Sequence, residues 1–446
     1  MILHNTAQVN TRIDAGTILT IDDNFTTLTD HSLIIENGVI TQISPTESVQ
    51  HIIASEHYCL PNHVIIPGLI NAHGHASMAL LRGIANDLPL NIWLQEHIWP
   101  AEGKWVDSDF VSFGAKLAMA EMLKSGTTTF SDMYFFPEVV AQMAQTVGMR
   151  TQLACPILDF PTAWGSGPDE YIEKTLELHR AFESSDLVHM AFGPHAPYTV
   201  SDDPIRSLIS AAREHSLPIQ MHVHETQKEV NDAVTNSGKR PIKRLSELGL
   251  FDPDLNTQAV HMTALTESEI SLLAKTNTSV IHCPESNMKL ASGFCPTQAL
   301  SAAGVNIALG TDGAASNNDL DMLGEMRTAA LIAKGDTGDA TALSAKECIR
   351  MATINGAKAL GLEQLIGSLE VYKQADIVAI DLDHLNTLPS YDLPADIVYN
   401  TNASQVTHTW VNGKLLVDCG HLTGIDEDML KDEARQWGQK IKSGNK

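Results

Sequence analysis

Two short runs of the chain end in histidines whose spacing suits metal binding. His73 and His75 close one apolar run, and His222 and His224 close another. Side chains alternate along a β-strand, so residues two positions apart face the same side and can present two imidazoles to one ion. One such pair is weak support for a metal site, because two strand-edge histidines would show the same pattern.

The metal interpretation gains support from the aspartate Asp312, which also stands at the end of an apolar run, far along the chain. Three histidines and one carboxylate leave a coordination position for water. A zinc-type ion lowers the pKa of that water from about 16 to about 7. We predict that His73, His75, His222 and Asp312 hold one divalent metal ion, with zinc the expected ion.

Three residues near these ligands are candidates for proton transfer or for orienting the water. Glu225 lies three residues after His222, where it can face a substrate without joining the metal, and Asp312 can accept the proton of the water. His261 could orient that water. The alternatives are a helix N-terminal acid for Glu225 and a buried structural histidine for His261. For His282, a role at the site and a role in shaping its loop are equally supported.

The elements that would position these residues alternate between strands and helices. Eight apolar or β-branched runs between residues 64 and 312 are predicted as strands, and helical periodicity, as at 113–124, fills the intervals. Eight parallel βα units predict a closed (β/α)8 TIM barrel, whose strand ends meet at one mouth. The predicted strands are 69–73, 127–132, 151–155, 188–192, 219–224, 259–261, 279–282 and 305–310.

The two chain ends have a different, β-rich character. An Asn-Gly pair between apolar runs, the strongest short hairpin signal, occurs at 37–38 and again at 412–413. We therefore expect an α/β protein with the barrel at 64–365. A small β-sandwich domain would be formed from both ends, 1–63 and 366–446, and would finish in a helical tail.

Composition limits the classes of partner. The formal net charge is -25, from 29 Lys+Arg and 54 Asp+Glu, which argues against nucleic-acid binding. The start of the chain lacks the pattern of a secretory signal, and no apolar run approaches the roughly 18 residues of a membrane helix. The six cysteines are scattered without a Cys-x-x-Cys pair, so we expect reduced thiols and a cytoplasmic protein. These features are compatible with a homo-oligomer.

Several longer segments resemble the amidohydrolase superfamily, most closely the 5'-methylthioadenosine/S-adenosylhomocysteine deaminases. The resemblance covers nearly the whole chain. It implies a metal-dependent hydrolytic deaminase that converts 5'-methylthioadenosine to 5'-methylthioinosine and ammonia, with S-adenosylhomocysteine and adenosine as further substrates. The segments are PGLINAHGHASMALLRGIANDLPLNIWLQEHIWPAE (67–102), SGTTTFSDMY (125–134), GPHAPYT (193–199), MHVHET (221–226), VHMT (260–263), HCPESNMKLASG (282–293) and LGTDGAASNNDLDMLGEMRTA (309–329).

The resemblance also implies roles for single residues, beside the same four metal ligands. Glu225 would pass a proton to the ring nitrogen and then to the leaving ammonia, while His261 and Asp312 would position and deprotonate the water. Glu102 would bind the ribose hydroxyls, and His195 would contact the nucleoside. Relatives with two metals carry a modified lysine at the end of the fourth strand. No lysine stands there in this chain, so we expect a single-metal site.

The loop after the third predicted strand departs from the family pattern. Members that accept S-adenosylhomocysteine are expected to carry arginines there, but Arg150 precedes the strand and 156–164 contains none. Phe160 and Trp164 suit a small thioether better than a carboxylate, so we predict a preference for 5'-methylthioadenosine. Arg150 and Trp164 are candidate substrate contacts, and plain packing is the alternative for this loop.

The residues argue against three alternatives to the deaminase. A guanine, cytosine or triazine hydrolase of the same superfamily is disfavoured by Glu102, which suits a ribose-bearing substrate. A non-catalytic metal-binding paralogue is disfavoured by Glu225 beside the complete ligand set. The cytidine-deaminase type is excluded because its Pro-Cys-x-x-Cys motif is missing.

Overall fold

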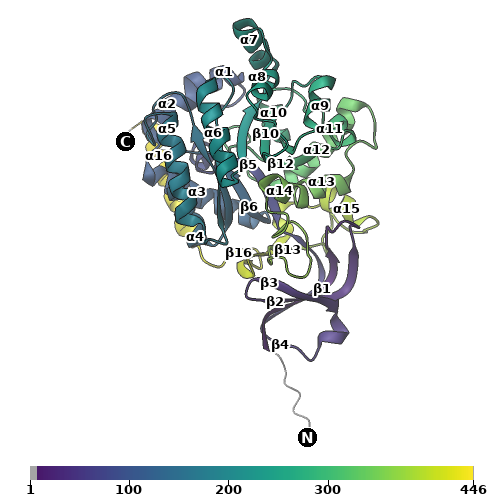
Figure 1. Cartoon of the computed structure of the whole chain (residues 1–446). Helices are drawn as coiled ribbons and strands as arrows, with labels where there is room; N and C mark the ends of the chain where they lie inside the picture. Colours follow the sequence, from purple (N-terminus) through teal and green to yellow (C-terminus); the bar gives the residue numbers. More distant parts are fainter. Residues whose placement is uncertain (1–7, 445–446) are drawn as a thin grey trace.

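A parallel β-barrel forms the centre of the chain. The computed structural model describes residues 8–444, and within them eight parallel strands follow one another around the barrel in sequence order (Figure 1). The last strand returns to the first, because the Asp312 backbone N–H donates to the His73 carbonyl at 3.0 Å. The strands are β5 (Leu69–Gly74), β6 (Thr127–Asp132), β7 (Arg150–Ile157), β8 (Val188–Pro194), β9 (Ile219–Val223), β10 (Thr257–His261), β11 (Thr278–His282) and β12 (Asn306–Leu309).

Helices cover the outside of the barrel, and their starts carry the expected signals. Asp107 caps the first long helix by accepting from the Phe110 N–H at 3.0 Å, and Pro137 and Pro168 begin two others. The helices are α3 (Ser108–Lys124), α4 (Pro137–Val147), α5 (Pro168–Phe182), α6 (Asp202–His215), α7 (Gln227–Ser237), α8 (Pro241–Glu247), α9 (Glu267–Leu273), α10 (Pro284–Lys289), α11 (Thr297–Ala302), α12 (Met322–Thr337), α13 (Ala345–Met351) and α14 (Ile354–Leu360).

The connection between β5 and β6 is longer than the other connections and holds several short helical turns. It carries Glu102 in the last of its helical segments. The segments are η2 (Ala76–Leu81), α1 (Leu90–Ile92), η3 (Trp93–Ile98) and α2 (Trp99–Trp105).

A second module is built from both chain ends, as predicted. Its strands form one hydrogen-bonded sheet in the order β16-β15-β14-β13-β4-β1-β2-β3, and its apolar side chains, Ile13, Leu33, Ile65 and Trp410 among them, share one core. Figure 1 shows the purple strands β1 to β4 below the barrel, with β13 and β16 next to them. The strands are β1 (Gln8–Leu19), β2 (Thr27–Glu36), β3 (Val39–Pro45), β4 (Ile53–Pro67), β13 (Ile377–Asp381), β14 (Val406–Val411), β15 (Lys414–Asp418) and β16 (His421–Leu422).

The chain finishes in a long helix that returns to the barrel. Leu430 packs with Phe113, and Glu427 accepts a hydrogen bond from Lys124 at 2.7 Å. No helix within residues 8–444 is both long and apolar enough to cross a membrane. The remaining elements are η1 (Thr46–Val49), α15 (Leu393–Ala395), η4 (Asp396–Asn400), η5 (Ala403–Gln405) and α16 (Glu427–Ser443).

A buried ion pair joins the two modules and corrects one prediction. Arg150 begins β7, at the end of the strand opposite the mouth, and its guanidinium holds both carboxylate oxygens of Asp376 at 2.9 and 3.0 Å. Both side chains are almost completely buried. A forked pair of this kind costs desolvation and is stable only when all its donors are used. The expected contact between Arg150 and substrate is therefore wrong.

Candidate metal and catalytic centre

Four histidines and one aspartate from different strands meet at the barrel mouth. His73 lies in β5 and His75 follows that strand, while His222 comes from β9. The Nε2 atoms of His73 and His222 lie 3.1 Å apart. Asp312 follows β12, and its Oδ1 lies 3.2 Å from the Nε2 of His75 and 3.6 Å from that of His73. His261 ends β10, with its ring 5.5 Å from that of His222.

The hydrogen bonds behind these rings determine which nitrogen faces the centre. The Nδ1 atom of His73 lies 2.7 Å from Gln220 Oε1, that of His75 lies 2.6 Å from the Met133 carbonyl, and that of His222 lies 2.7 Å from the His195 carbonyl. Carbonyl oxygens only accept, so each Nδ1 carries a proton, and in the neutral ring each Nε2 carries a lone pair.

Lone pairs that converge in this way repel one another unless a cation lies between them. Burial, and after it the neighbouring His73, hold the pKa of His222 well below its usual range, so this ring is a neutral donor. Neutral imidazoles and an ionised carboxylate are the ligands that a zinc-type ion requires. The residues present therefore fit a divalent metal ion.

Asp312 is held by groups that the sequence analysis did not identify. The hydroxyls of Ser286 and Ser316 donate to its Oδ2 at 2.6 and 2.9 Å, and the Gly313 N–H donates to its Oδ1 at 2.8 Å. Gln220, behind His73, was also missed. Gln220 stands two residues before His222 on the same strand face, and this spacing could have indicated it. No sequence pattern indicated the two serines.

Glu225 lies beside the histidine cluster at the opening of a cavity. Its Oε1 is 3.9 Å from the Nε2 of His261, whose Nδ1 lies 2.9 Å from Asn287 Oδ1. Burial, with the charge of Asp312 adding to it, raises the pKa of Glu225 to about 8. A carboxyl group of this kind exchanges a proton readily near neutral pH.

Two further predicted residues reach the same mouth. Glu102 accepts a hydrogen bond from the Tyr134 hydroxyl at 2.8 Å, and burial raises the pKa of Glu102 to about 7. The ring of His195 lies 5.0 Å from that of His222, and burial lowers the pKa of His195 to about 4, which keeps it neutral. The role of Glu102 could be predicted only from the family resemblance, because a single acid on a helix has no distinguishing sequence pattern.

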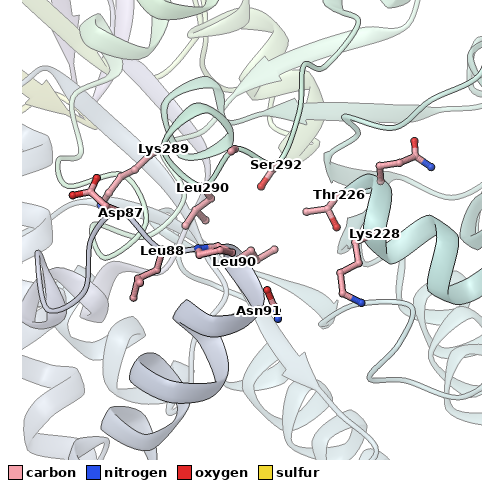
Figure 2. A pocket seen from close by; sticks show the side chains of 12 residues that line it. Asp87, Leu88, Leu90, Asn91, Thr226, Lys228, Lys289, Leu290 and Ser292 are labelled. Carbon is pink, nitrogen blue, oxygen red and sulfur yellow. The ribbon is translucent and has the colours of Figure 1, made fainter.

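The mouth opens into two adjoining cavities. One, of about 600 Å³, is lined by Glu225, Leu94, Trp99 and Tyr198 among others. The other, of about 520 Å³, is shown in Figure 2, where Leu88, Leu90 and Asn91 face Thr226 and Lys228 across the opening. The two cavities share Leu90, Asn91, Thr226 and Lys228.

Trp164 and His224 do not reach the centre. The Trp164 indole N–H donates to Glu138 at 2.9 Å, and its ring stacks on Tyr171 at 5.6 Å, so it packs within its loop and the predicted substrate contact is corrected. His224 turns away, with its Nδ1 3.1 Å from the Ala264 carbonyl. His282 is buried at the end of β11 and has no direct part in the cluster among the described contacts.

Known proteins share this architecture. The amidohydrolase family model matches residues 64–416, which include the whole barrel. The chain belongs to the amidohydrolase family. This amidohydrolase is 52% identical over 414 residues to the 5-methylthioadenosine/S-adenosylhomocysteine deaminase of Saccharophagus degradans, with 92% of each chain covered. It is 48% identical to the enzyme of the same name from Teredinibacter turnerae, covering 98% of this chain and 99% of the relative.

Solved structures agree with the fold. An adenosine deaminase from Xanthomonas campestris, crystallised with bound zinc, matches this amidohydrolase with a TM-score of 0.96 and 45% identity, over 98% of this chain and 99% of the other. An atrazine chlorohydrolase from Arthrobacter aurescens matches with a TM-score of 0.90, 96% of this chain and 99% of the other being covered, at 21% identity. The second likeness shows the fold alone.

Proposed function

We propose that this amidohydrolase is a zinc-dependent deaminase of adenine nucleosides. Its main reaction converts 5'-methylthioadenosine and water into 5'-methylthioinosine and ammonia, and S-adenosylhomocysteine and adenosine are further substrates. The observation that carries the proposal is the convergence of the Nε2 atoms of three histidines and Asp312 beside the protonatable Glu225. The names of the deaminases that are 48% and 52% identical supply the substrate class.

The chain supplies the proton transfers of this reaction. When bound, the ion lowers the pKa of water to about 7 and so provides a nucleophile at neutral pH. Asp312 accepts the proton of that water, and His261 orients it. Glu225 carries a proton at pH 7, because burial raises its pKa to about 8. It donates this proton to ring nitrogen N1 as C6 is attacked. Glu225 then takes up the proton of the new C6 hydroxyl and passes it to the amino group, which leaves as ammonia, and the proton accepted by Asp312 restores Glu225.

Binding of the nucleoside is assigned to the residues at the edge of the mouth. Glu102 accepts from the ribose hydroxyls, and the hydrogen bond from Tyr134 keeps its carboxylate in one orientation. His195, neutral because its pKa is lowered to about 4, contacts the base. This ribose contact favours a nucleoside over guanine, cytosine or a triazine.

The tail beyond the 5'-sulfur determines the preference among nucleosides. A buried substrate carboxylate requires an unused cation, usually an arginine. Arg150 is committed to Asp376, and the cationic side chains along the cavity of about 600 Å³ are each paired with an acid. These pairs are Lys228 with Asp232, Lys239 with Glu247, and Arg244 with Asp202. A methyl group needs no such partner.

Measurement of ammonia release tests the function and the preference together. We expect kcat/KM for 5'-methylthioadenosine to exceed that for S-adenosylhomocysteine by roughly 10- to 150-fold, the value of one charge-assisted pair of about 1.5–3 kcal/mol. Equal values, or the reverse order, would contradict the preference. No ammonia from any of the three nucleosides, with release from guanine, cytosine or a triazine, would contradict the function.

We propose a cytoplasmic location because the cysteine thiols are free. All six cysteines are free, which suits a reducing compartment. The net charge of -25 disfavours a nucleic-acid partner. Cell fractionation checks the location, and recovery in a secreted or periplasmic fraction would contradict it. Light scattering of the purified enzyme determines whether it forms a homo-oligomer.

A further inference from the structure

A second cluster of metal-binding side chains lies in the module built from the chain ends. His408 is in β14, Asp418 ends β15, and Cys419 begins the turn to β16. The Nε2 of His408 is 3.3 Å from Asp418 Oδ1 and 3.9 Å from Cys419 Sγ. A nitrogen, an oxygen and a sulfur ligand thus face one another on two neighbouring strands.

The ring of His408 turns its Nε2 atom toward this cluster. The Thr407 hydroxyl donates to the Ala379 carbonyl at 3.4 Å, and its oxygen lies 2.8 Å from His408 Nδ1. In the tautomer in which this hydroxyl accepts the Nδ1 proton, Nε2 carries a lone pair that can bind a metal ion. Trp410 stacks on the ring, with 5.5 Å between the two ring centroids.

The distances match those between ligands of one metal ion. Bonds of about 2.0–2.3 Å at tetrahedral angles place nitrogen and oxygen ligands about 3.4 Å apart, and nitrogen and sulfur ligands about 3.6 Å apart. The observed separations of 3.3 and 3.9 Å agree within a few tenths of an ångström. Thiolate and imidazole together select zinc and similar transition-metal ions over magnesium or calcium.

A second trio of the same residue types shows what a site without metal character looks like. His57 lies only 2.7 Å from Asp14 Oδ2, which is a hydrogen-bond distance, and Cys59 lies 3.7 Å from His57. Arg12 donates to both oxygens of Asp14, at 2.7 and 2.8 Å. The Arg12 guanidinium takes up both carboxylate oxygens of Asp14 and repels a metal cation. Asp418, by contrast, is paired with no arginine or lysine among the described ion pairs.

Two further features distinguish the cluster around His408. Cys419 and Gly420 form a two-residue turn with φ of 49° and 79°, and the first position of such a turn favours Asn, Asp or Gly rather than cysteine. Turn geometry therefore gives no reason for a thiol there. In addition, both ring nitrogens of His63 are buried without a hydrogen-bond partner among residues 8–444, and its ring lies 6.2 Å from that of His408.

We propose that His408, Asp418 and Cys419 form a second, thiolate-containing site for a divalent transition-metal ion such as zinc or cobalt. The ion displaces the thiol proton and binds the three donor atoms. Asp418 and Cys419 are exposed, so the fourth position is open to water. The bound ion ties the β15–β16 turn to β14. The site is separate from the barrel mouth, and its existence does not depend on the function proposed above.

Cobalt titration of the enzyme that carries one zinc per chain, in the barrel centre, with the second site left empty, tests this site. The barrel centre contains only histidine and aspartate ligands, so thiolate-to-cobalt charge-transfer absorption reports the second site alone. We expect the band to saturate at one cobalt per chain, to be lost in Cys419→Ser and to persist in Cys59→Ser. Asp418→Asn keeps the thiol and should weaken cobalt binding at least about tenfold, as loss of even an outer-shell partner does. Ammonia release by Cys419→Ser should equal that of the parent enzyme.

Thiol labelling provides a second readout that does not depend on cobalt spectra. Cys59 and Cys419 are the exposed cysteines, and the other four are buried. In the Cys59→Ser variant, zinc should therefore protect the one reactive thiol from labelling. Absence of a charge-transfer band at saturating cobalt, a band that survives Cys419→Ser, or labelling that zinc does not slow would each overturn the proposal.

Discussion

The Nε2 atoms of His73 and His222 lie 3.1 Å apart, and both rings hold their protons on Nδ1, toward Gln220 and the His195 carbonyl. Two nitrogen lone pairs at this distance repel each other in a buried site. A shared cation turns this repulsion into attraction, because each lone pair then becomes a bond to the ion. The close approach of these two rings at the barrel mouth is therefore favourable when a metal ion is bound between them.

The first prediction concerns removal of that metal. Exhaustive chelation should abolish ammonia release and lower Tm, because an ion bound only by the folded chain stabilises it, and zinc should restore both. We expect one ion per barrel centre. The count is best made by metal analysis of Cys419→Ser, in which the proposed second site is disabled. Two tightly bound ions in that variant, or full activity after metal removal, would contradict a single-metal centre.

The second prediction is for Glu225→Gln. The amide keeps the size of the side chain but cannot pass a proton, and general acid–base groups typically contribute about 10² to 10⁴ in rate. We expect kcat to fall by at least this order while zinc content stays at the parent value. Near-normal kcat in the variant would remove Glu225 from the proton path.

The third prediction is for Tyr134→Phe, which removes the hydroxyl that donates to Glu102 at 2.8 Å. One hydrogen bond to a charged group is worth about 1.5–3 kcal/mol, so kcat/KM for 5'-methylthioadenosine should fall by roughly 10-fold or more. If Glu102 holds the ribose hydroxyls, the penalty should shrink for an analogue that lacks those hydroxyls. An equal penalty for both substrates would indicate that Tyr134 acts elsewhere. Glu102→Gln, measured on the same two substrates, is the matched control.

The fourth prediction concerns stability in acid. Burial, and after it the positive charge of Arg150, lower the pKa of His189 to about 4, and its Nε2 has no partner in the described chain. The unfolded chain binds this proton near pH 6.5, but the folded chain does not. The free energy of unfolding should therefore fall as pH drops from about 6.5 toward 4, by up to about 1.4 kcal/mol per pH unit.

The variant His189→Gln separates this histidine from the other titrating groups. It cannot take up the proton, so its unfolding midpoint in urea should depend less steeply on pH between about 6.5 and 4 than that of the parent enzyme. Zinc must be kept saturating, since the metal ligands also titrate. Parallel pH profiles for the two proteins would show that His189 does not carry the effect.

Much of the fold followed from local pattern. The run predicted at 127–132 matches β6 to the residue, and the runs at 188–192 and 279–282 match β8 and β11 closely. Alternation and apolar runs encode such strands locally. Eight parallel strands then bring their ends to one mouth, so His73 and His222 could be placed together although 149 residues separate them.

Other features were decided only by the tertiary structure. Arg150 and Asp376 are 226 residues apart, and no local pattern shows that the β7 arginine is consumed by an aspartate of the other module. Trp164 was expected at the substrate, but its contacts with Glu138 and Tyr171 are what bury it. Sequence patterns record periodicity and residue type, and these determine which elements form. A side chain's partners depend on which elements become neighbours in space, and that is settled only when the chain packs.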